Sequence, residues 1–152
     1  MTDPLLTTEE ARHYIRMDKY AADQRAYNYP APGESLTIPL TTLTSDEQFN
    51  LDISRGKIVI SKTKHQLRYH SPIVLLRLDI NGPKHRNPDG QIIEGTHLHI
   101  YREDYNDAWA EELPADFADT TNPQTTLRDF MRYCNVVKKP RIQERLDVDD
   151  NR

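Results

Sequence analysis

Ile73-Val-Leu-Leu-Arg-Leu-Asp-Ile80 is the most apolar stretch of the 152-residue sequence, and it decides the fold. Aliphatic and β-branched residues dominate it, and turn-forming residues bound it, Pro72 before it and Asn81-Gly82-Pro83 after it. This pattern predicts a strand in the middle of a sheet. Because successive side chains of a strand alternate between its faces, Arg77 and Asp79 are expected to share one face.

Alternation of apolar and polar residues predicts further strands at Leu36–Leu40, in a hairpin over Phe49–Ile60, at Gln66–His70 and at Thr96–Arg102. Pro39 lacks an amide hydrogen, which restricts the first of these strands to an edge of the sheet. Arg55-Gly56 is the predicted turn of the hairpin. Together these runs predict an antiparallel sheet of about five strands.

Helices are expected before and after the sheet in the sequence. Thr7 and Glu10 have the spacing of a capping box, which predicts a helix over residues 8–22. Asp104 is the expected N-cap of a short helix, and Thr126 opens another, whose apolar stripe is Leu127, Phe130, Met131 and Cys134. The predicted fold class is therefore α+β: an N-terminal helix, an antiparallel sheet of about five strands, and C-terminal helices packed on one face.

The length of the chain fits a single domain, expected over residues 1–146 with a polar tail at 147–152. The single cysteine, Cys134, excludes an internal disulfide and a cysteine-based zinc site. The longest purely apolar run, Ile73–Leu76, has four residues, and the N-terminus lacks a basic start and an apolar segment. These features predict a soluble protein of the cytoplasm with no membrane partner.

The net charge of −4 conceals a basic central segment. Between Arg55 and Arg102 the sequence has nine lysines and arginines against three acidic residues, together with five of its six histidines. A basic stretch within an acidic protein indicates a local anion site. The alternative is an ordinary solvated sheet face whose lysines protect it from aggregation.

The histidines of the run Gly95-Thr-His-Leu-His-Ile-Tyr-Arg-Glu103 follow a regular spacing. In a strand, period-two alternation places His97, His99 and Tyr101 on one face and the aliphatic residues on the other. Because the aliphatic residues belong in the core, the histidines and the tyrosine are expected to point away from it, into solvent or a cleft.

This constellation matches phosphodiester chemistry without a metal. One imidazole takes the proton of the attacking hydroxyl, another protonates the leaving oxygen, and cations stabilise the phosphorane. RNA carries its own 2′-hydroxyl nucleophile, so the leading hypothesis is RNA recognition with metal-independent endoribonuclease activity and no cofactor. The catalytic candidates are His97, His99, His85 and Tyr101, and the substrate-binding candidates are Arg77, Lys84, Arg86, Asn87 and Arg102.

Two alternatives use the same residues. His97-x-His99 is a metal-ligand spacing, and Glu103 is a third candidate ligand for a divalent metal. The same run reproduces the H-x-H-x₃-E core of the first cupin motif, although the second cupin motif is missing. The other alternative is a non-enzymatic interaction module whose basic face binds nucleic acid or an acidic protein partner.

Several linked pieces of the sequence resemble an uncharacterised family of small bacterial and phage-like proteins. They are Leu76–Ile80, His85-x-Asn-Pro-Asp-Gly90, Gly95-x-His-x-His-x-Tyr-Arg-Glu103, Trp109-Ala110 and Asp129-Phe130-Met131. The resemblance covers about residues 48–135 and implies no established activity. It implies a site at His85, Asn87, Asp89, His97, His99 and Tyr101. Such proteins often travel on mobile elements in toxin–antitoxin or phage-defence settings, which is context by analogy.

Overall fold

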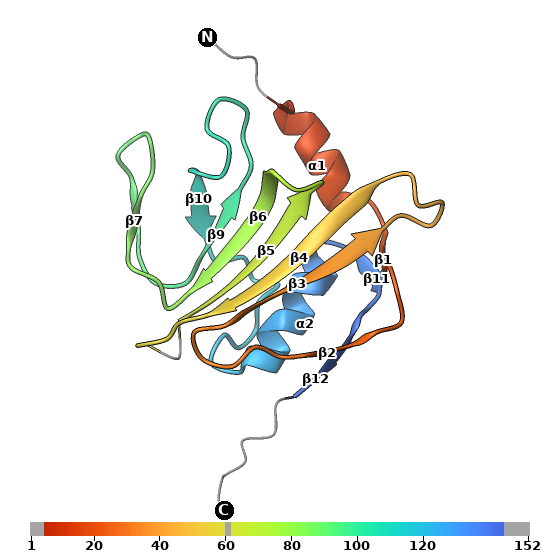
Figure 1. Ribbon diagram of the computed structural model, residues 1–152. Coiled ribbons are helices and arrows are strands. Elements are labelled where there is room, and N and C mark those ends of the chain that lie inside the picture. Colours follow the sequence, from red (N-terminus) through yellow and green to blue (C-terminus); the bar gives the residue numbers. More distant parts are fainter. Residues whose placement is uncertain (1–4, 60–61, 145–152) are drawn as a thin grey trace, which may run out of the picture.

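The computed structural model describes residues 5–59 and 62–144, and these form two helices and twelve strands (Figure 1). The elements, in chain order, are α1 (Thr8–Arg16), β1 (Lys19–Ala21), β2 (Ala26–Asn28), β3 (Ser35–Thr41), β4 (Gln48–Arg55), β5 (Thr63–Tyr69), β6 (Ile73–Ile80), β7 (His85–Arg86), β8 (Ile92–Ile93), β9 (His97–Ile100), β10 (Ala110–Glu112), α2 (Pro123–Tyr133), β11 (Val136–Lys138) and β12 (Arg141–Gln143). The predicted polar tail at 147–152 lies outside the described residues.

An α+β fold is confirmed, but the main sheet is larger than predicted. It has eight strands in the order β10-β9-β6-β5-β4-β3-β1-β11, antiparallel except for the β1–β11 pair, and it curls toward α2 (Figure 1). The prediction of about five strands was wrong because β1, β10 and β11 have three residues each. Runs that short show no alternation. Two smaller sheets pair β12 with β2 and β7 with β8.

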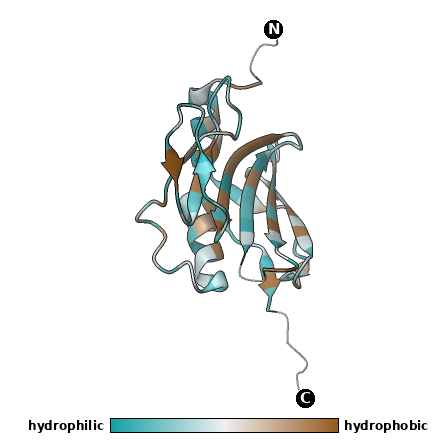
Figure 2. Cartoon of the chain, turned by 90° about the vertical axis from the view of Figure 1, so that its left-hand side faces the viewer, coloured by the Kyte–Doolittle hydropathy of each residue, from teal (hydrophilic) through white to brown (hydrophobic). Residues whose placement is uncertain are grey.

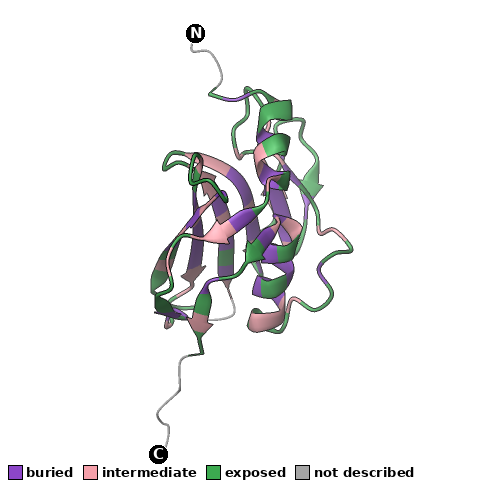
Figure 3. Cartoon of the chain, turned by 90° about the vertical axis from the view of Figure 1, so that its right-hand side faces the viewer, coloured by how far each residue is buried: buried purple, intermediate pink, exposed green. Residues whose placement is uncertain are grey.

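The hydrophobic core lies between the helices and one face of the sheet. Leu76 and Leu78 of β6 and Leu98 of β9 are fully buried, in one cluster with Ile15 of α1 and Phe130 of α2. Figure 2 shows hydrophobic and hydrophilic residues alternating along the strands, and Figure 3 shows the buried residues gathered between the sheet and the two helices. The opposite face of the sheet carries Thr37, Asp52, Gln66 and Arg68, together with Arg77, Asp79, His97 and His99. This separation follows from the period-two geometry of a strand.

The first helix ends earlier than predicted. The capping box is confirmed, because Glu10 N–H donates to Thr7 Oγ1 (3.0 Å) and Thr7 N–H donates to the Glu10 carboxylate (2.8 Å). The helix stops at Arg16, however, and residues 19–21 form β1, so the prediction of helix over 8–22 was wrong in its second half. Pairing of β1 with β3 and β11 overrides the helical spacing of the alanines.

Lys19 caps the end of this helix. Its ammonium is fully buried and donates to the carbonyl oxygens of Ile15 (2.8 Å), Met17 (2.8 Å) and Cys134 (2.9 Å). One ammonium thus binds carbonyl oxygens at the ends of both helices. These carbonyls have no partner within their own helix, and Lys19 supplies the missing hydrogen bonds. Burial lowers the pKa of Lys19 to about 8.

The prediction of several C-terminal helices was wrong. Residues 104–113 do not form a helix, because Asp104 and Asn106 adopt left-handed backbone conformations (φ 72° and 54°) and the chain then enters β10. A single helix, α2, follows. It begins at Pro123, earlier than the predicted Thr126, because the Asn122 side chain caps it. Its predicted apolar stripe is buried. No helix of the described chain is long and apolar enough to cross a bilayer.

The hairpin prediction was correct for its first arm and wrong for its second. β4 pairs with β5, while Ile58 is 94% exposed and Ile60 lies outside the described residues.

The prediction that Pro39 restricts its strand to an edge was also wrong. Pro39 lies in an internal strand, since β3 has β4 on one side and β1 on the other. The carbonyl of Pro39 accepts from Ala22 N–H, so its nitrogen faces the side where β1 has just ended, and no bond to β4 is lost.

Candidate functional site

The histidine pair lies on β9, between β6 and β10, on the face of the sheet opposite the helices. The register pairs His99 with Arg77 and His97 with Asp79, so these four side chains project from one face. The predicted alternation is confirmed for β9, because Leu98 is in the core while the histidines point away from it. Both histidines are nevertheless only 1% exposed. His85 of β7 and the segment Asp107–Ala108 cover them.

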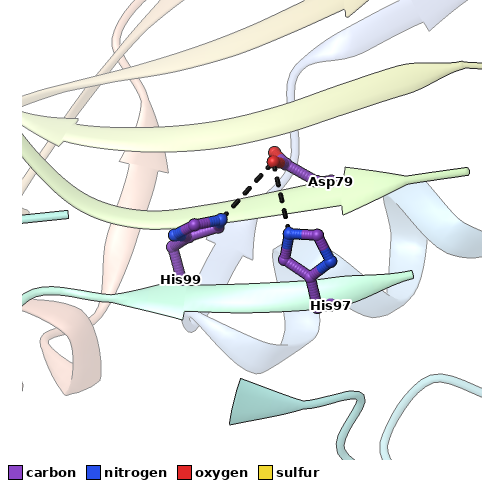
Figure 4. Close-up of side chains that lie close together, drawn as sticks. All are labelled: Asp79, His97 and His99. Carbon is purple, nitrogen blue, oxygen red and sulfur yellow. Dashed lines mark ion pairs between the residues drawn. The ribbon is translucent and has the colours of Figure 1, made fainter. Parts of the chain in front are cut away.

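Asp79, His97 and His99 converge on one point of this face (Figure 4). One carboxylate oxygen, Asp79 Oδ2, lies 3.5 Å from His97 Nε2 and 3.4 Å from His99 Nε2. All three atoms lie within 4.8 Å of one another. We call these three residues the Asp79 cluster. Two imidazoles and a carboxylate converging on one point are a ligand set for a divalent metal.

Backbone carbonyls fix the orientation of both rings. His97 Nδ1 lies 2.8 Å from Gly95 O, and His99 Nδ1 lies 2.8 Å from Asp107 O. A carbonyl only accepts, so each Nδ1 carries a hydrogen, and the Nε2 of a neutral ring presents its lone pair to Asp79. Burial lowers the pKa of His97, which favours its neutral form. Metal-binding histidines are held in the same way by an outer hydrogen bond.

Arg77 supplies a positive charge at the same point. Its guanidinium donates to Asp79 Oδ1 (3.0 Å) and to Asp107 Oδ2 (2.6 Å), and its Nη2 lies 3.0 Å from His99 Nε2. Burial alone would raise the pKa of Asp79, but the positive charge of Arg77 helps to keep that pKa below its usual range. Asp79 is therefore a carboxylate, and the guanidinium is the cation that it now holds.

His85 completes a triangle of imidazoles. Its ring centroid lies 5.8 Å from that of His97 and 4.7 Å from that of His99, and the latter two are 4.9 Å apart. The structure thus brings together the three histidines selected from the sequence. His85 Nε2 lies 2.7 Å from Ala108 O, so in the neutral ring Nδ1 is left as the acceptor.

Tyr101 and Glu103 do not join the histidines. The strand ends at Ile100, and Tyr101 is buried in the core, where its hydroxyl donates to Leu6 O (2.8 Å) and accepts from Leu6 N–H (3.1 Å). Glu103 is exposed and accepts from Thr8 N–H (3.3 Å). The third member of the cluster is Asp79, in the place that the metal alternative had assigned to Glu103.

The remaining substrate-binding candidates, Arg77 aside, are dispersed. Lys84 is exposed, and Arg86 donates to Gly90 O within its own turn (3.3 Å). Asn87 is buried and pairs with the backbone N–H and carbonyl of Ala110 (both 2.8 Å), which docks its loop on β10. Arg102 lies over the Trp109 ring, 3.9 Å from its centroid. Asp89 shapes its turn by accepting from Gln91 N–H (3.0 Å).

Two residues of the site were missed. Asp79 had been placed on the face of Arg77 without a role, and Asp107 lay in a segment that was expected to be helical. The spacing of Arg77 and Asp79 was the available signal for the first, because an acidic residue two positions from an arginine on a buried strand needs a partner. No signal was available for Asp107, whose position depends on the turn at 102–106.

Comparisons with known proteins give a family and no relative of established activity. Neither a search of curated proteins nor a search of solved structures found a match. A sequence profile of one family matches residues 6–136, which include every residue of the site described above. Membership of an uncharacterised family, expected from the resemblance, is confirmed. The chain belongs to the family of unknown function DUF6978.

Proposed function

We propose that the protein binds a divalent transition metal through Asp79, His97 and His99. The observation that carries the proposal is the direction of the two rings. Each Nδ1 is committed to a backbone carbonyl, and each Nε2 faces the same carboxylate oxygen. Two neutral imidazoles that present lone pairs to a carboxylate repel it, and a cation between them turns that repulsion into attraction.

Two of the three distances between the candidate ligand atoms are close to those around such an ion. Ligands about 2.0–2.1 Å from a tetrahedral metal stand about 3.3–3.4 Å from one another. The carboxylate oxygen is 3.4 and 3.5 Å from the two nitrogens, close to the edges of that tetrahedron. Two nitrogens and one oxygen suit Zn²⁺, Fe²⁺ or Co²⁺ better than Mg²⁺ or Ca²⁺, which prefer oxygen. Three protein ligands leave at least one coordination position for another group.

Arg77 is the competitor of the metal. Its Nη2 lies 3.0 Å from His99 Nε2, so the guanidinium must withdraw when an ion binds there. Asp107 offers it a second carboxylate at 2.6 Å, which keeps Arg77 paired after it leaves Asp79. Metal and guanidinium therefore exchange at the carboxylate, and neither the arginine nor the aspartate is left as an unpaired buried charge.

The test is metal content and metal affinity of the purified chain. We expect one Zn²⁺ or Co²⁺ per chain, measured by elemental analysis after dialysis, and no retained metal in His97→Ala/His99→Ala. The matched control is His13→Gln/His70→Asn, which removes two exposed imidazoles and should keep the metal. Asp79→Asn keeps the shape of the side chain and should also lose the metal. It therefore tests the site even if the double alanine variant does not fold. A wild type that retains none of Zn²⁺, Co²⁺ and Fe²⁺ would overturn the proposal.

Metal-independent cleavage of RNA stays a prediction, supported by the triangle of imidazoles and by Arg77 beside it. The burial of His97 and His99 weighs against it, because a phosphodiester reaches them only if the loop of His85 moves. Mixed RNA incubated in EDTA with wild type and with His97→Ala/His99→Ala decides the matter. Cleavage by wild type alone would support a ribonuclease, and intact RNA in both samples would reject it.

The non-enzymatic interaction module, whose basic face would bind nucleic acid or an acidic protein, stays a prediction as well. Binding that weakens with added salt is its test.

A further inference from the structure

A second candidate site lies on the opposite side of the sheet from the Asp79 cluster. A cavity of about 400 Å³ opens between α1, the end of β9 and α2. Ile15, Leu76 and Ile100 supply its apolar floor. The volume lies within the range of small-molecule sites, roughly 300–1,000 Å³. The sheet separates this cavity from the Asp79 cluster. A ligand proposed for the cavity can therefore be tested independently of the metal proposal.

Three arginines face this cavity, and the side chains of two of them have no partner in the described part of the chain. The side chains of Arg12 and Arg16, one helical turn apart on α1, make no ion pair or hydrogen bond with any residue in 5–59 or 62–144. Like charges at this spacing destabilise a helix. The helix dipole accounts for Arg16 in the last turn, but it does not account for Arg12 or for a third arginine across the cavity. An anionic ligand would give all three guanidinium groups a common partner.

The third arginine, Arg102, is held in place by contacts with Trp109 and Glu111. The guanidinium of Arg102 lies 3.9 Å from the centroid of the Trp109 ring, and its Nη2 is 4.0 Å from the Glu111 carboxylate. Stacking on an aromatic ring restricts the side chain and leaves its N–H groups free to bind an anion. Arg102 was selected from the sequence as a phosphate-binding residue, and the structure moves it to this cavity, away from the histidines.

Charge and shape together specify the ligand. Three arginines against the single carboxylate of Glu111 leave two positive charges in excess, which matches a phosphate monoester dianion better than a carboxylate. Beside the charges lie the apolar floor and the ring of Tyr133. Tyr101 also lines the cavity, but its hydroxyl is committed to Leu6, so it offers only apolar surface. We propose that this cavity binds an organic phosphate monoester with an aromatic or apolar body.

The test is titration of the full chain with two such esters, AMP and phenyl phosphate, by calorimetry at pH 7.5. We expect Kd below about 1 mM for at least one ester. Inorganic phosphate, adenosine and phenol should each bind at least tenfold more weakly, because each fills only half of the site. Arg12→Gln/Arg16→Gln should weaken ester binding at least tenfold. Affinity should also fall below about pH 6, where the ester loses its second negative charge.

The matched control is Arg128→Gln/Arg132→Gln, which removes the same charge at the same spacing from the exposed side of α2. It should change ester affinity less than twofold. Equal weakening in both double variants would mean general electrostatic attraction and would overturn the site. Failure of both esters to bind, or tighter binding of benzoate than of phenyl phosphate, would overturn the assigned ligand class. Thermal unfolding of each variant shows that it is folded.

Discussion

Two aspartate–arginine pairs lie on the polar face of the sheet, and they differ in how completely the carboxylate is bonded. Asp52 accepts four hydrogen bonds, two from Arg68 (2.6 and 2.9 Å), one from Gln66 (2.8 Å) and one from Thr37 (2.7 Å). Asp79 accepts one from Arg77, at Oδ1 (3.0 Å), while its Oδ2 faces two imidazole nitrogens at 3.4 and 3.5 Å.

The difference separates a structural pair from a candidate site. Every donor around Asp52 is a neutral or positive N–H or O–H group, so the carboxylate has no capacity for another cation. The imidazole nitrogens beside Asp79 have lone pairs whenever their rings are neutral, and three atoms that can bind a cation then meet there. Burial of an ion pair alone therefore does not identify a candidate site. The useful observation is whether the neighbouring groups present hydrogens or lone pairs to the carboxylate.

Substitution of the two aspartates tests this comparison most strongly. Asp79→Asn should lower affinity for Zn²⁺ by about 1000-fold, more than the 10- to 100-fold that loss of an outer hydrogen-bond partner costs. Asp52→Asn should leave that affinity within about threefold, since Asp52 touches none of the ligands. Competition with a chromophoric chelator measures both. Equal losses in the two variants would contradict the distinction.

His65 tests whether burial alone makes a histidine a site. It is fully buried beside Phe130, and among the described residues neither of its ring nitrogens has a hydrogen-bond partner. Burial lowers the pKa of His65 to about 4, while the unfolded chain binds this proton near pH 6.5. Stability is therefore full above pH 6.5 and should fall by about 3 kcal/mol as the pH drops toward 4.

His65→Leu should flatten this pH dependence and leave metal binding unchanged. Urea unfolding between pH 7 and 4 measures it, and His70→Asn, at an exposed position, is the matched control that should keep the wild-type slope. If the slope persists in His65→Leu, another group is responsible for it.

The cost of breaking each pair in the metal-free protein should also differ. Asp52→Asn should lower the free energy of unfolding by about 2 kcal/mol, because Arg68 loses a partly buried, two-point partner. Asp79→Asn should cost about half as much, because Arg77 keeps its bond to Asp107. Chemical denaturation in EDTA compares the two variants. A larger loss for Asp79→Asn would show that Asp79 is the structural pair.

The smallest expected effect concerns the two arginines. Arg77→Gln should raise affinity for Zn²⁺ by about tenfold, since it removes the competing cation, which corresponds to about 1.4 kcal/mol. Arg68→Gln should leave that affinity unchanged, because among residues 5–59 and 62–144 its guanidinium binds the side chain of Asp52 and no other. The same chelator competition measures both variants. A decrease for Arg77→Gln would mean that the guanidinium supports the ion instead of competing with it.

Local alternation predicted the faces of β6 and β9 but not what lies across from them. The aliphatic residues and the histidines of β9 separate as expected, because side-chain direction in a strand depends only on position along it. Which residue stands opposite His97 depends on the register of two strands joined by a connection of 16 residues that contains β7 and β8, and no local pattern specifies that register. The sequence therefore predicts the face on which Asp79 lies but not its contact with the histidines.

The errors near Tyr101 have a similar cause. The alternation was extended through Glu103, but the strand ends at Ile100, and Tyr101 turns into the core to bond Leu6. The apolar spacing of residues 105–113 resembles that of a helix, yet pairing of Ala110 with His99 stabilises an edge strand there. Tertiary pairing overrode local periodicity in both places.

Lys19 has a consequence for the order of folding. Its ammonium joins the end of α1 to a carbonyl 115 positions away, at the end of α2. A contact of such sequence separation forms late, after the sheet has brought the chain ends together. Lys19→Met should therefore speed unfolding and leave the refolding rate nearly unchanged, which stopped-flow kinetics can measure. One buried cation would then control how long the folded state persists, with little influence on how quickly it forms.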